Sequence, residues 1–247
     1  AIHGQLTSQT MVYFFTSKPP NEEAQPQLMD APGGFSAPIP PDGCMLYMGK
    51  DKFENEELIK YAWPEDVWFH VDKESSAHVY IRLPRGSHKK GDNWFKEIHP
   101  LVVEDCCQLV KANSIRGNKL DNVSVVFTPA SNLKKSGGME VGQVGFHSQT
   151  NVFKAKIKER RNEIVNRLDK TKKWEEPNLQ ADLIQRNKEE RVVAAKEAEV
   201  DRVQREKQEA EWKKEKEERS YDKLYDPTQM TAVGEMELDS DGEPDFM

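Results

Sequence analysis

The sequence predicts an α+β fold in which helices pack on an antiparallel sheet, followed by a long charged α-helix and a disordered acidic tail. Three observations support this prediction. Short apolar and β-branched runs recur between turn residues over the first 153 positions, which is typical of strands. Two segments of the same region place apolar residues at helical spacing. Beyond Pro177 the chain becomes dense in Glu, Lys, Arg and Gln, and it turns acidic after Arg219.

The predicted elements follow one another along residues 11–153. They are strands at Met11–Thr16 and Met45–Met48, a helix at Glu54–Ala62, strands at Asp66–Val71 and Ala77–Leu83, a helix from Pro100 to about Ser114, and strands at Val123–Thr128 and from Val144–Phe146 to Phe153. Acidic residues in its first turn favour the first helix, and Pro64 ends it. Pro100 suits the first turn of the second helix, whose apolar residues return every three to four positions.

Changes in composition divide the chain into four segments. We expect an added leader at 1–10 before a natural start at Met11, an α+β domain at 11–153 with a proline-rich insertion at 18–43, a charged helical arm at 154–219 and a disordered tail at 220–247. Val193, Val200 and Val203 fit one heptad frame, but lysines share their seam, which argues against a stable paired coil. The favoured interpretation of the arm is a solvated single helix.

The overall composition restricts the class of protein. Of 247 residues, 32% are charged and 36% are apolar, whereas compact domains average about 25% charged and about 45–50% apolar residues, glycine included. No apolar run approaches the roughly 20 residues of a membrane span, and no secretory signal is visible. Three cysteines exclude a disulfide scaffold and fit a reducing compartment. We therefore expect a cytoplasmic protein, with the nucleus as the alternative.

The net charge of −7 is a property of the tail, because residues 220–247 carry eight acids and one base. The stretch Lys154–Lys173 instead carries nine bases against three acids, which is typical of nucleic-acid binding. Acidic protein partners, or the tail itself, would be attracted to the same bases. Lys134 and Lys135 precede a glycine pair and are candidate phosphate ligands, with an ordinary solvated turn as the alternative. The candidate backbone contacts in the basic stretch are Lys154, Lys156, Lys158, Arg160, Arg161 and Arg167.

The two central strands are predicted to form a hairpin with chemically active side chains on one face. Alternation places six of them there: Asp66, Trp68, His70, His78, Tyr80 and Arg82. With residues 72–76 as the turn, Asp66 pairs with Arg82, Trp68 with Tyr80, and His70 with His78. The aromatic pair beside Arg and His predicts a stacking platform for an unpaired base, and a second packed layer under a helix is the alternative. Two facing imidazoles cannot both be protonated cheaply, so one is expected to titrate below about 6.5.

Catalytic and metal-binding interpretations have less support. No strained nucleophile turn surrounds Ser75 or Ser76, and serines in a five-residue turn are usually turn formers. Cys106 and Cys107 lack the spacing of a four-ligand zinc site with the histidines, and Cys106 falls on the apolar face of its predicted helix. We therefore expect no enzymatic activity, no metal site and no cofactor.

Four motifs in sequence order carry a family resemblance. They are Asn55–Leu58 (NEEL), Asp66–His70 (DVWFH), Ser75–Val79 (SSAHV) and Lys134-Lys135 followed by Gly142–Val144 (GQV). Together they resemble the NFACT-R domain family in its stand-alone eukaryotic form. The resemblance implies an α+β domain with nucleic-acid-binding character. In larger relatives the domain accompanies ribosome-associated quality-control proteins that engage tRNA and the large ribosomal subunit, whose tail-adding activity depends on further domains and is not carried over.

The sequence thus predicts a non-enzymatic nucleic-acid-binding module. The leading ligand is RNA, either tRNA or rRNA, in a translation setting with the ribosome as a candidate partner. DNA is the nearest alternative. From a different class, the chain could be an interaction scaffold that docks a protein through its charged helix and acidic tail. Base specificity, the choice between RNA and DNA, and the oligomeric state stay open from the sequence.

Overall fold

The structure, a computed structural model of the chain, describes residues 10–20, 28–29 and 38–219. The chain divides into two compact units between Asn187 and Lys188. The expectations for the leader, for much of the insertion and for the acidic tail fall outside the described residues. No helix within the described ranges is both long enough and apolar enough to cross a membrane.

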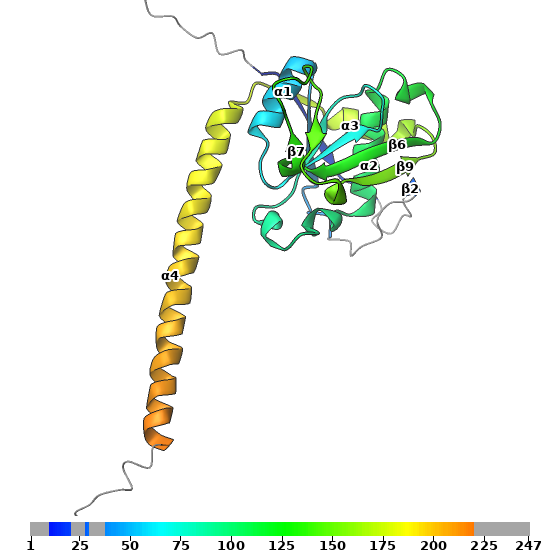
Figure 1. Cartoon of the computed structure of the whole chain (residues 1–247). Coiled ribbons are helices and arrows are strands. Elements are labelled where there is room, and N and C mark those ends of the chain that lie inside the picture. Colours follow the sequence, from blue (N-terminus) through cyan, green and yellow to red (C-terminus); the bar gives the residue numbers. More distant parts are fainter. Residues whose placement is uncertain (1–9, 21–27, 30–37, 220–247) are drawn as a thin grey trace, which may run out of the picture. The chain divides into compact units, whose positions relative to one another are not determined.

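The predicted antiparallel α+β fold is confirmed. Eight strands form one sheet in the order β10–β1–β3–β5–β4–β6–β9–β2, and every neighbouring pair is antiparallel. Figure 1 shows β6, β9 and β2 side by side at one edge. A second, two-stranded sheet pairs β7 (Leu133–Lys134) with β8 (Gly145–Phe146). The strands of the large sheet are β1 (Val12–Ser17), β2 (Leu28–Met29), β3 (Cys44–Gly49), β4 (Asp66–Val71), β5 (Val79–Arg82), β6 (Val123–Pro129), β9 (Phe153–Ile157) and β10 (Lys173–Glu175).

The main core lies between the sheet and helix α2 (Pro100–Ala112). Alternation along β4 sends Val67, Phe69 and Val71 to this side, and all three are buried. The predicted helix from Pro100 is confirmed and ends at Ala112, two residues before its expected end. It is buried along most of its length, and helix α3 (Asn162–Thr171) packs against both α2 and β1.

Helix α1 (Lys52–Tyr61) lies on the opposite face of the sheet. It begins where the Asp51 side chain accepts the backbone N–H groups of Phe53 and Glu54, at 2.8 and 3.1 Å. Satisfying such orphan donors is the usual role of an aspartate at this position. Leu58 of α1 packs into a second apolar cluster on the sheet. The cluster's other buried members are Val12, Tyr47, Trp68, Tyr80, Val126, Ala130 and Leu133.

A buried carboxylate, that of Asp66, ties three strands and a turn together beneath α1. Its Oδ2 accepts the Tyr47 hydroxyl of β3 at 2.6 Å and the Trp63 backbone N–H at 2.6 Å. Arg82 of β5 donates from Nε to Oδ1 at 2.8 Å and from Nη2 to Oδ2 at 3.0 Å. The Arg82 guanidinium lies 3.7 Å from the centroid of the Trp63 ring. Four hydrogen bonds from charged and neutral donors therefore compensate the burial of this charge.

The α+β domain extends beyond residue 153, the boundary expected from composition. Residues 153–157 form β9, which pairs with β6, and residues 173–175 form β10, which pairs with β1. The expectation of a helical arm from residue 154 is therefore wrong, because Ala155 and Ile157 bury their side chains in the main core. The expected continuous strand from Val144 to Phe153 is also interrupted, since a 3₁₀ turn at Gln149–Asn151 separates β8 from β9.

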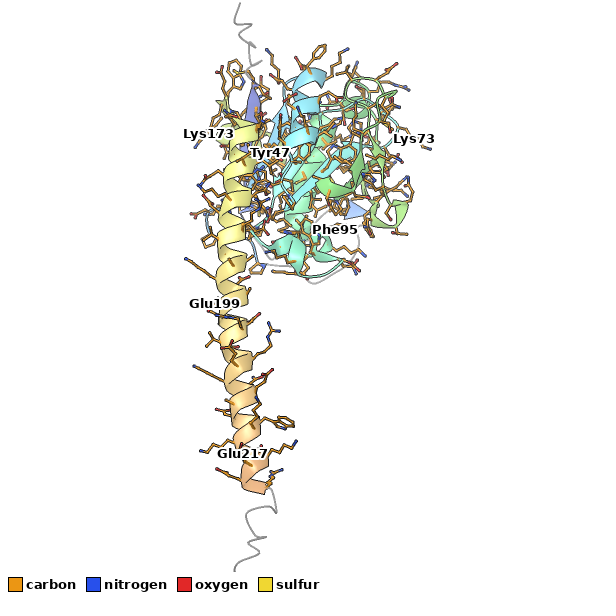
Figure 2. All side chains as sticks on the ribbon, turned by 60° about the vertical axis from the view of Figure 1, so that its left-hand side comes forward. Tyr47, Lys73, Phe95, Lys173, Glu199 and Glu217 are labelled. Atoms are coloured by element: carbon orange, nitrogen blue, oxygen red, sulfur yellow. The ribbon has the colours of Figure 1, made fainter. Side chains whose placement is uncertain are left out.

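The charged helix is α4, which spans Leu179–Arg219. Its first turns belong to the α+β unit, where the Arg186 guanidinium is ion-paired with the buried carboxylate of Glu65. Residues 191–219 are exposed, and pairs such as Arg219–Glu215, at 2.6 Å, link successive turns. Figure 2 shows Glu199 and Glu217 on this part of the helix. These features match the solvated helix favoured from the sequence, which argued against a stable paired coil.

Neutralising the buried carboxylate should destabilise the α+β domain far more than neutralising an exposed one. Asp66→Asn leaves Arg82 without its charged partner, and breaking a buried ion pair costs about 3–5 kcal/mol. Asp72→Asn, which removes the exposed pair with Lys154, is the matched control and should cost about 0–1 kcal/mol. Chemical denaturation measures both losses. Equal losses for the two variants would show that Asp66 does not hold the layers together.

Candidate nucleic-acid interface

The predicted register of the central hairpin is confirmed. Asp66 pairs with Arg82 and Trp68 with Tyr80 across β4 and β5. The rings of His70 and His78 also meet, with centroids 4.9 Å apart and edge-to-face planes. The six side chains therefore share one face of the sheet, as the alternation of the sequence predicts.

The expectation that this face is an exposed stacking platform is wrong. Trp68 is 2% exposed and Tyr80 is 0% exposed. The Tyr80 ring stacks on Tyr47 with centroids 4.9 Å apart, and Phe146 of β8 contacts Trp68 edge-on at 5.9 Å. The face is the second packed layer that the sequence left as the alternative. No base can reach these rings in the folded domain.

Lys135 fastens the loop that covers this layer. Its ammonium group donates to Glu56 Oε1 of α1 at 2.5 Å and to the backbone carbonyls of Glu140 and Gln143. The same Glu56 oxygen accepts the Gly142 N–H, also at 2.5 Å. The predicted phosphate ligand thus has three protein acceptors already, and its structural role is to hold the 135–143 loop against α1.

Of the two histidines of the hairpin, His78 is buried and His70 is half-buried, and both are electrically neutral near pH 7. Trp68 Nε1 donates to Nδ1 of His78 at 2.9 Å. Burial, followed by the neighbouring His70, lowers the pKa of His78 to about 3. Burial also lowers the pKa of His70, although the Val71 carbonyl and Asp72 act in the opposite direction. The expectation that one imidazole titrates below its usual value is confirmed, and both do so.

Two arginines of the basic stretch that the sequence predicted as phosphate contacts form ion pairs with acidic residues of α2 instead. Arg167 on α3 donates to both carboxylate oxygens of Asp105, at 2.9 and 2.6 Å. Arg161 donates to Glu104 at 3.0 Å and is paired with Glu163. Because Asp105 and Glu104 are buried, these arginines neutralise charge at the α2–α3 contact. Their main role is to stabilise that contact.

The first three lysines of the basic stretch form a row on an open part of the sheet. Lys154 and Lys156 alternate with the buried Ala155 and Ile157 on β9, and Lys158 follows directly. We call Lys154, Lys156 and Lys158 the β9 lysine row. All three are exposed, and strand geometry spaces alternate residues about 6.8 Å apart. Lys154 also contacts Asp72 at 2.7 Å.

The sequence contains a pattern that predicts the β9 lysine row, but the expectation of a helical arm from residue 154 did not use it. In Phe153–Lys158 charged and apolar residues alternate strictly, which is the period of a half-buried strand. A helix would have placed Lys156 on the side opposite Lys154 and Lys158, whereas the strand collects all three on one face. Outside the row, Arg160 is exposed and donates to Asn118 Oδ1 at 2.8 Å, and Lys134 is exposed on β7.

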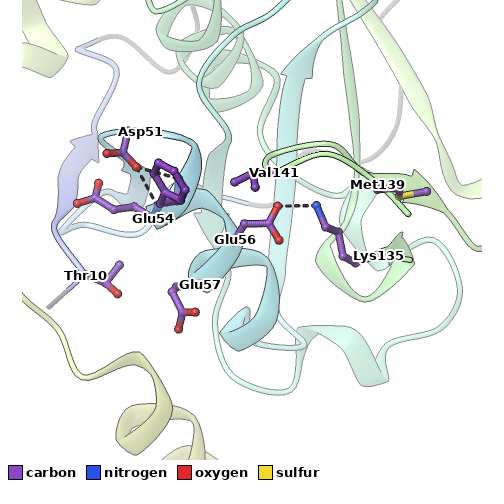
Figure 3. Close-up of a pocket in the computed structure, with 9 residues that line it drawn as sticks. Thr10, Asp51, Glu54, Glu56, Glu57, Lys135, Met139 and Val141 are labelled. Carbon is purple, nitrogen blue, oxygen red and sulfur yellow. Dashed lines mark hydrogen bonds and ion pairs between the residues drawn. The ribbon is translucent and has the colours of Figure 1, made fainter. Parts of the chain in front are cut away.

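A pocket of about 540 Å³ beside α1 has the wrong charge for a nucleic acid. Figure 3 shows Asp51, Glu54, Glu56 and Glu57 around it, with Lys135 directed toward Glu56. The four carboxylates outnumber the one ammonium group, which is itself paired. The negative charge of this pocket would repel phosphate, whereas the β9 lysine row would attract it.

The cysteines belong to the core, as the sequence predicts for Cys106. Cys106 and Cys107 are fully buried on α2, and burial raises the pKa of both thiols above their usual value. Cys44 is partly buried, and burial raises its pKa to about 11. Thiols held in the protonated form are poor nucleophiles and poor metal ligands.

The fold is that of an antiparallel α+β domain with a row of exposed lysines, and comparison with known proteins defines the family. Residues 35–148 match the NFACT protein RNA binding domain. The chain is 45% identical over 224 residues to coiled-coil domain-containing protein 25 of Bos taurus, covering 90% of this chain and 95% of that protein. It therefore belongs to the NFACT-R family, in the stand-alone form of coiled-coil domain-containing protein 25.

Further relatives align over shorter parts of the chain. The chain is 56% identical over 146 residues to coiled-coil domain-containing protein 25 of Mus musculus, covering 59% of this chain and 67% of that protein. Protein JLP2 of Saccharomyces cerevisiae is 39% identical over 164 residues, or 66% and 68% of the two chains. A solved C-terminal structure of the fibronectin/fibrinogen-binding protein from Streptococcus suis aligns with a TM-score of 0.40 at 22% identity, over 52% of this chain and 47% of that one.

Acidification should destabilise the domain through His78. An imidazole titrates near 6.5 in the unfolded chain and at about 3 in the folded one. Between these values the unfolded chain binds more protons, so the free energy of unfolding falls as the pH drops, by at most about 1.4 kcal/mol per pH unit for one group. In His78→Asn the amide oxygen can still accept from Trp68. Thermal midpoints of this variant and the wild type should converge as the pH falls from about 7 to about 4, and parallel curves would contradict the assignment.

Proposed function

We propose that this protein is an RNA-binding module that holds the RNA backbone on the β9 lysine row. The observation that carries the proposal is the placement of three exposed lysines at alternate positions along β9 and directly after it. Their spacing of about 6.8 Å is of the same order as the distance between successive phosphates of a stretched single strand. The membership of an RNA-binding domain family supports RNA as the ligand.

The β9 lysine row positions a backbone and does not read bases. Ammonium groups contact phosphates as point charges, and such contacts carry no sequence information by themselves. The aromatic side chains of the same sheet face, Trp68 and Tyr80, are buried and offer no stacking surface. We therefore expect affinity that depends steeply on salt and only weakly on sequence.

We also propose that the RNA belongs to the translation machinery, as tRNA or rRNA, and that the protein acts in the cytoplasm as a binder without enzymatic activity. The support is the resemblance to the domain that accompanies ribosome-associated quality-control proteins. Sedimentation of cell extracts on sucrose gradients, with and without ribonuclease, tests this setting. Absence of the protein from ribosomal fractions at low salt would contradict it.

Neutralising the β9 lysine row should weaken RNA binding and flatten its salt dependence. Lys156→Gln with Lys158→Gln removes two phosphate contacts, so the slope of log affinity against log salt should fall by about 1.4 for a single strand. Lys170→Gln with Lys173→Gln is the matched control, because it removes the same charge from the same basic stretch but outside the row. Fluorescence anisotropy with a labelled single-stranded RNA measures both slopes. Equal changes in the two double variants would show that net charge, and not the row, governs binding.

A further inference from the structure

A polar pocket of about 440 Å³ lies where β6 ends, away from the acidic pocket beside α1. Three segments line it: the 88–94 loop, the turn at 129–132 that follows β6, and residues 147–151 before β9. The volume falls in the range of about 300–1,000 Å³ that small-molecule and nucleotide sites occupy. Asp92 is the one acid among the lining residues, which also include Lys89, His88 and His147.

Hydrogen bonds fix two walls of this pocket relative to each other. The buried Asn132 donates from its amide to Thr128 Oγ1 at 2.9 Å and to the Ser148 carbonyl at 2.8 Å, and it accepts the Ser148 N–H at 2.8 Å. Thr128 Oγ1 in turn donates to the Asn151 carbonyl at 2.7 Å. The turn after β6 and the segment before β9 are thus held in place without a ligand, and such preorganisation lowers the cost of binding.

The groups that remain for a ligand are uncharged donors and acceptors beside a cation. Within the ranges that the structure describes, no other protein group bonds to the side chains of Ser131, His147 and Asn151. A hydroxyl, an imidazole and an amide can donate to or accept from sugar hydroxyls and phosphate oxygens. Lys89 adds a positive charge to the same lining, and Trp94 adds an apolar side. This combination suits a sugar phosphate.

We propose that this pocket holds one ribonucleotide unit of the bound RNA, with its phosphate near Lys89 and His147 and its ribose hydroxyls near Ser131 and Asn151. The proposal rests on the proposed RNA-binding function, and it adds that the ribose and its phosphate are the groups recognised. Asn151 stands three residues before Lys154, so a strand leaving the pocket reaches the β9 lysine row within about 10 Å. Contacts to the 2′-hydroxyl distinguish RNA from DNA, which the lysines alone cannot do.

The decisive comparison uses two exposed serines that receive the same charge. Ser131→Asp places a carboxylate inside the pocket, whereas Ser136→Asp places one on the 135–143 loop outside it. Affinities are measured for a single-stranded RNA and for DNA of the same sequence. Wild type should prefer RNA, and Ser131→Asp should weaken RNA binding about tenfold or more and remove the preference, because the carboxylate replaces the hydroxyl that contacts the ribose and repels the phosphate held in the same pocket. Ser136→Asp should change either affinity less than about twofold, and equal melting temperatures show that both variants fold.

The outcomes distinguish failure of the pocket proposal from failure of the proposed RNA-binding function. If wild type binds no RNA, the proposed function itself fails. If RNA binds and depends on Lys156 and Lys158, but Ser131→Asp matches Ser136→Asp or the wild type binds DNA equally well, the pocket is overturned while the row stands.

The source of the nucleotide is resolved by imidazole resonances of His147 in the full-length protein. A shift on adding adenosine 5′-monophosphate assigns the pocket to free nucleotides as well as RNA. A shift with the RNA oligonucleotide alone restricts it to a unit of the polymer. Either result supports the sugar-phosphate site, and no shift with either probe would overturn it.

Discussion

The buried carboxylate of Asp66 is the constraint on which the rest of the domain depends. A charge at this depth is tolerated only where several donors converge on it, and the donors here come from β3, from β5 and from the turn before β4. Meeting that requirement fixes the register of three neighbouring strands and the position of Trp63. The aromatic layer then packs around a polar centre whose geometry admits little variation, and α1 and the 135–143 loop cover it.

How much of the aromatic layer could be predicted from the sequence depends on how far apart along the chain the contacting residues lie. Alternation in Asp66–Val71 and Ala77–Leu83 predicts the hairpin, its register and the membership of each face, because period and turn length are local properties. Whether a sheet face is exposed or covered depends instead on residues that are distant in the sequence. Trp68 is covered by Phe146, from 78 positions along the chain, and by a loop held in place through Glu56 and Lys135. No pattern within the hairpin carries that information.

The basic residues show the same limit of prediction from sequence, because their ion-pair partners are distant along the chain. Counting charges over Lys154–Lys173 treats every base alike, yet the folded chain divides them into two groups. Arg161 and Arg167 neutralise carboxylates of α2 and are part of the fold, whereas the β9 lysine row faces outward. The division depends on which bases meet a buried acid, and the buried Glu104 and Asp105 are more than 50 positions away from their arginines. Only the strict alternation in Phe153–Lys158 would have identified the exposed subset as a strand.

The shortest strand at the edge of the large sheet, β2, has a consequence for association between separate molecules. β2 consists only of Leu28 and Met29, within the proline-rich insertion at 18–43, and it pairs with β9 opposite Ile157 and Lys156 at the outer edge of the sheet. Unpaired strand edges invite pairing with another chain, and proteins limit this with very short edge strands and with lysines. Both protections are present at this edge, because β2 is very short and because β9 carries lysines of the β9 lysine row. Losing the insertion would expose backbone donors and acceptors along β9, so this segment contributes to keeping the chains from assembling edge to edge.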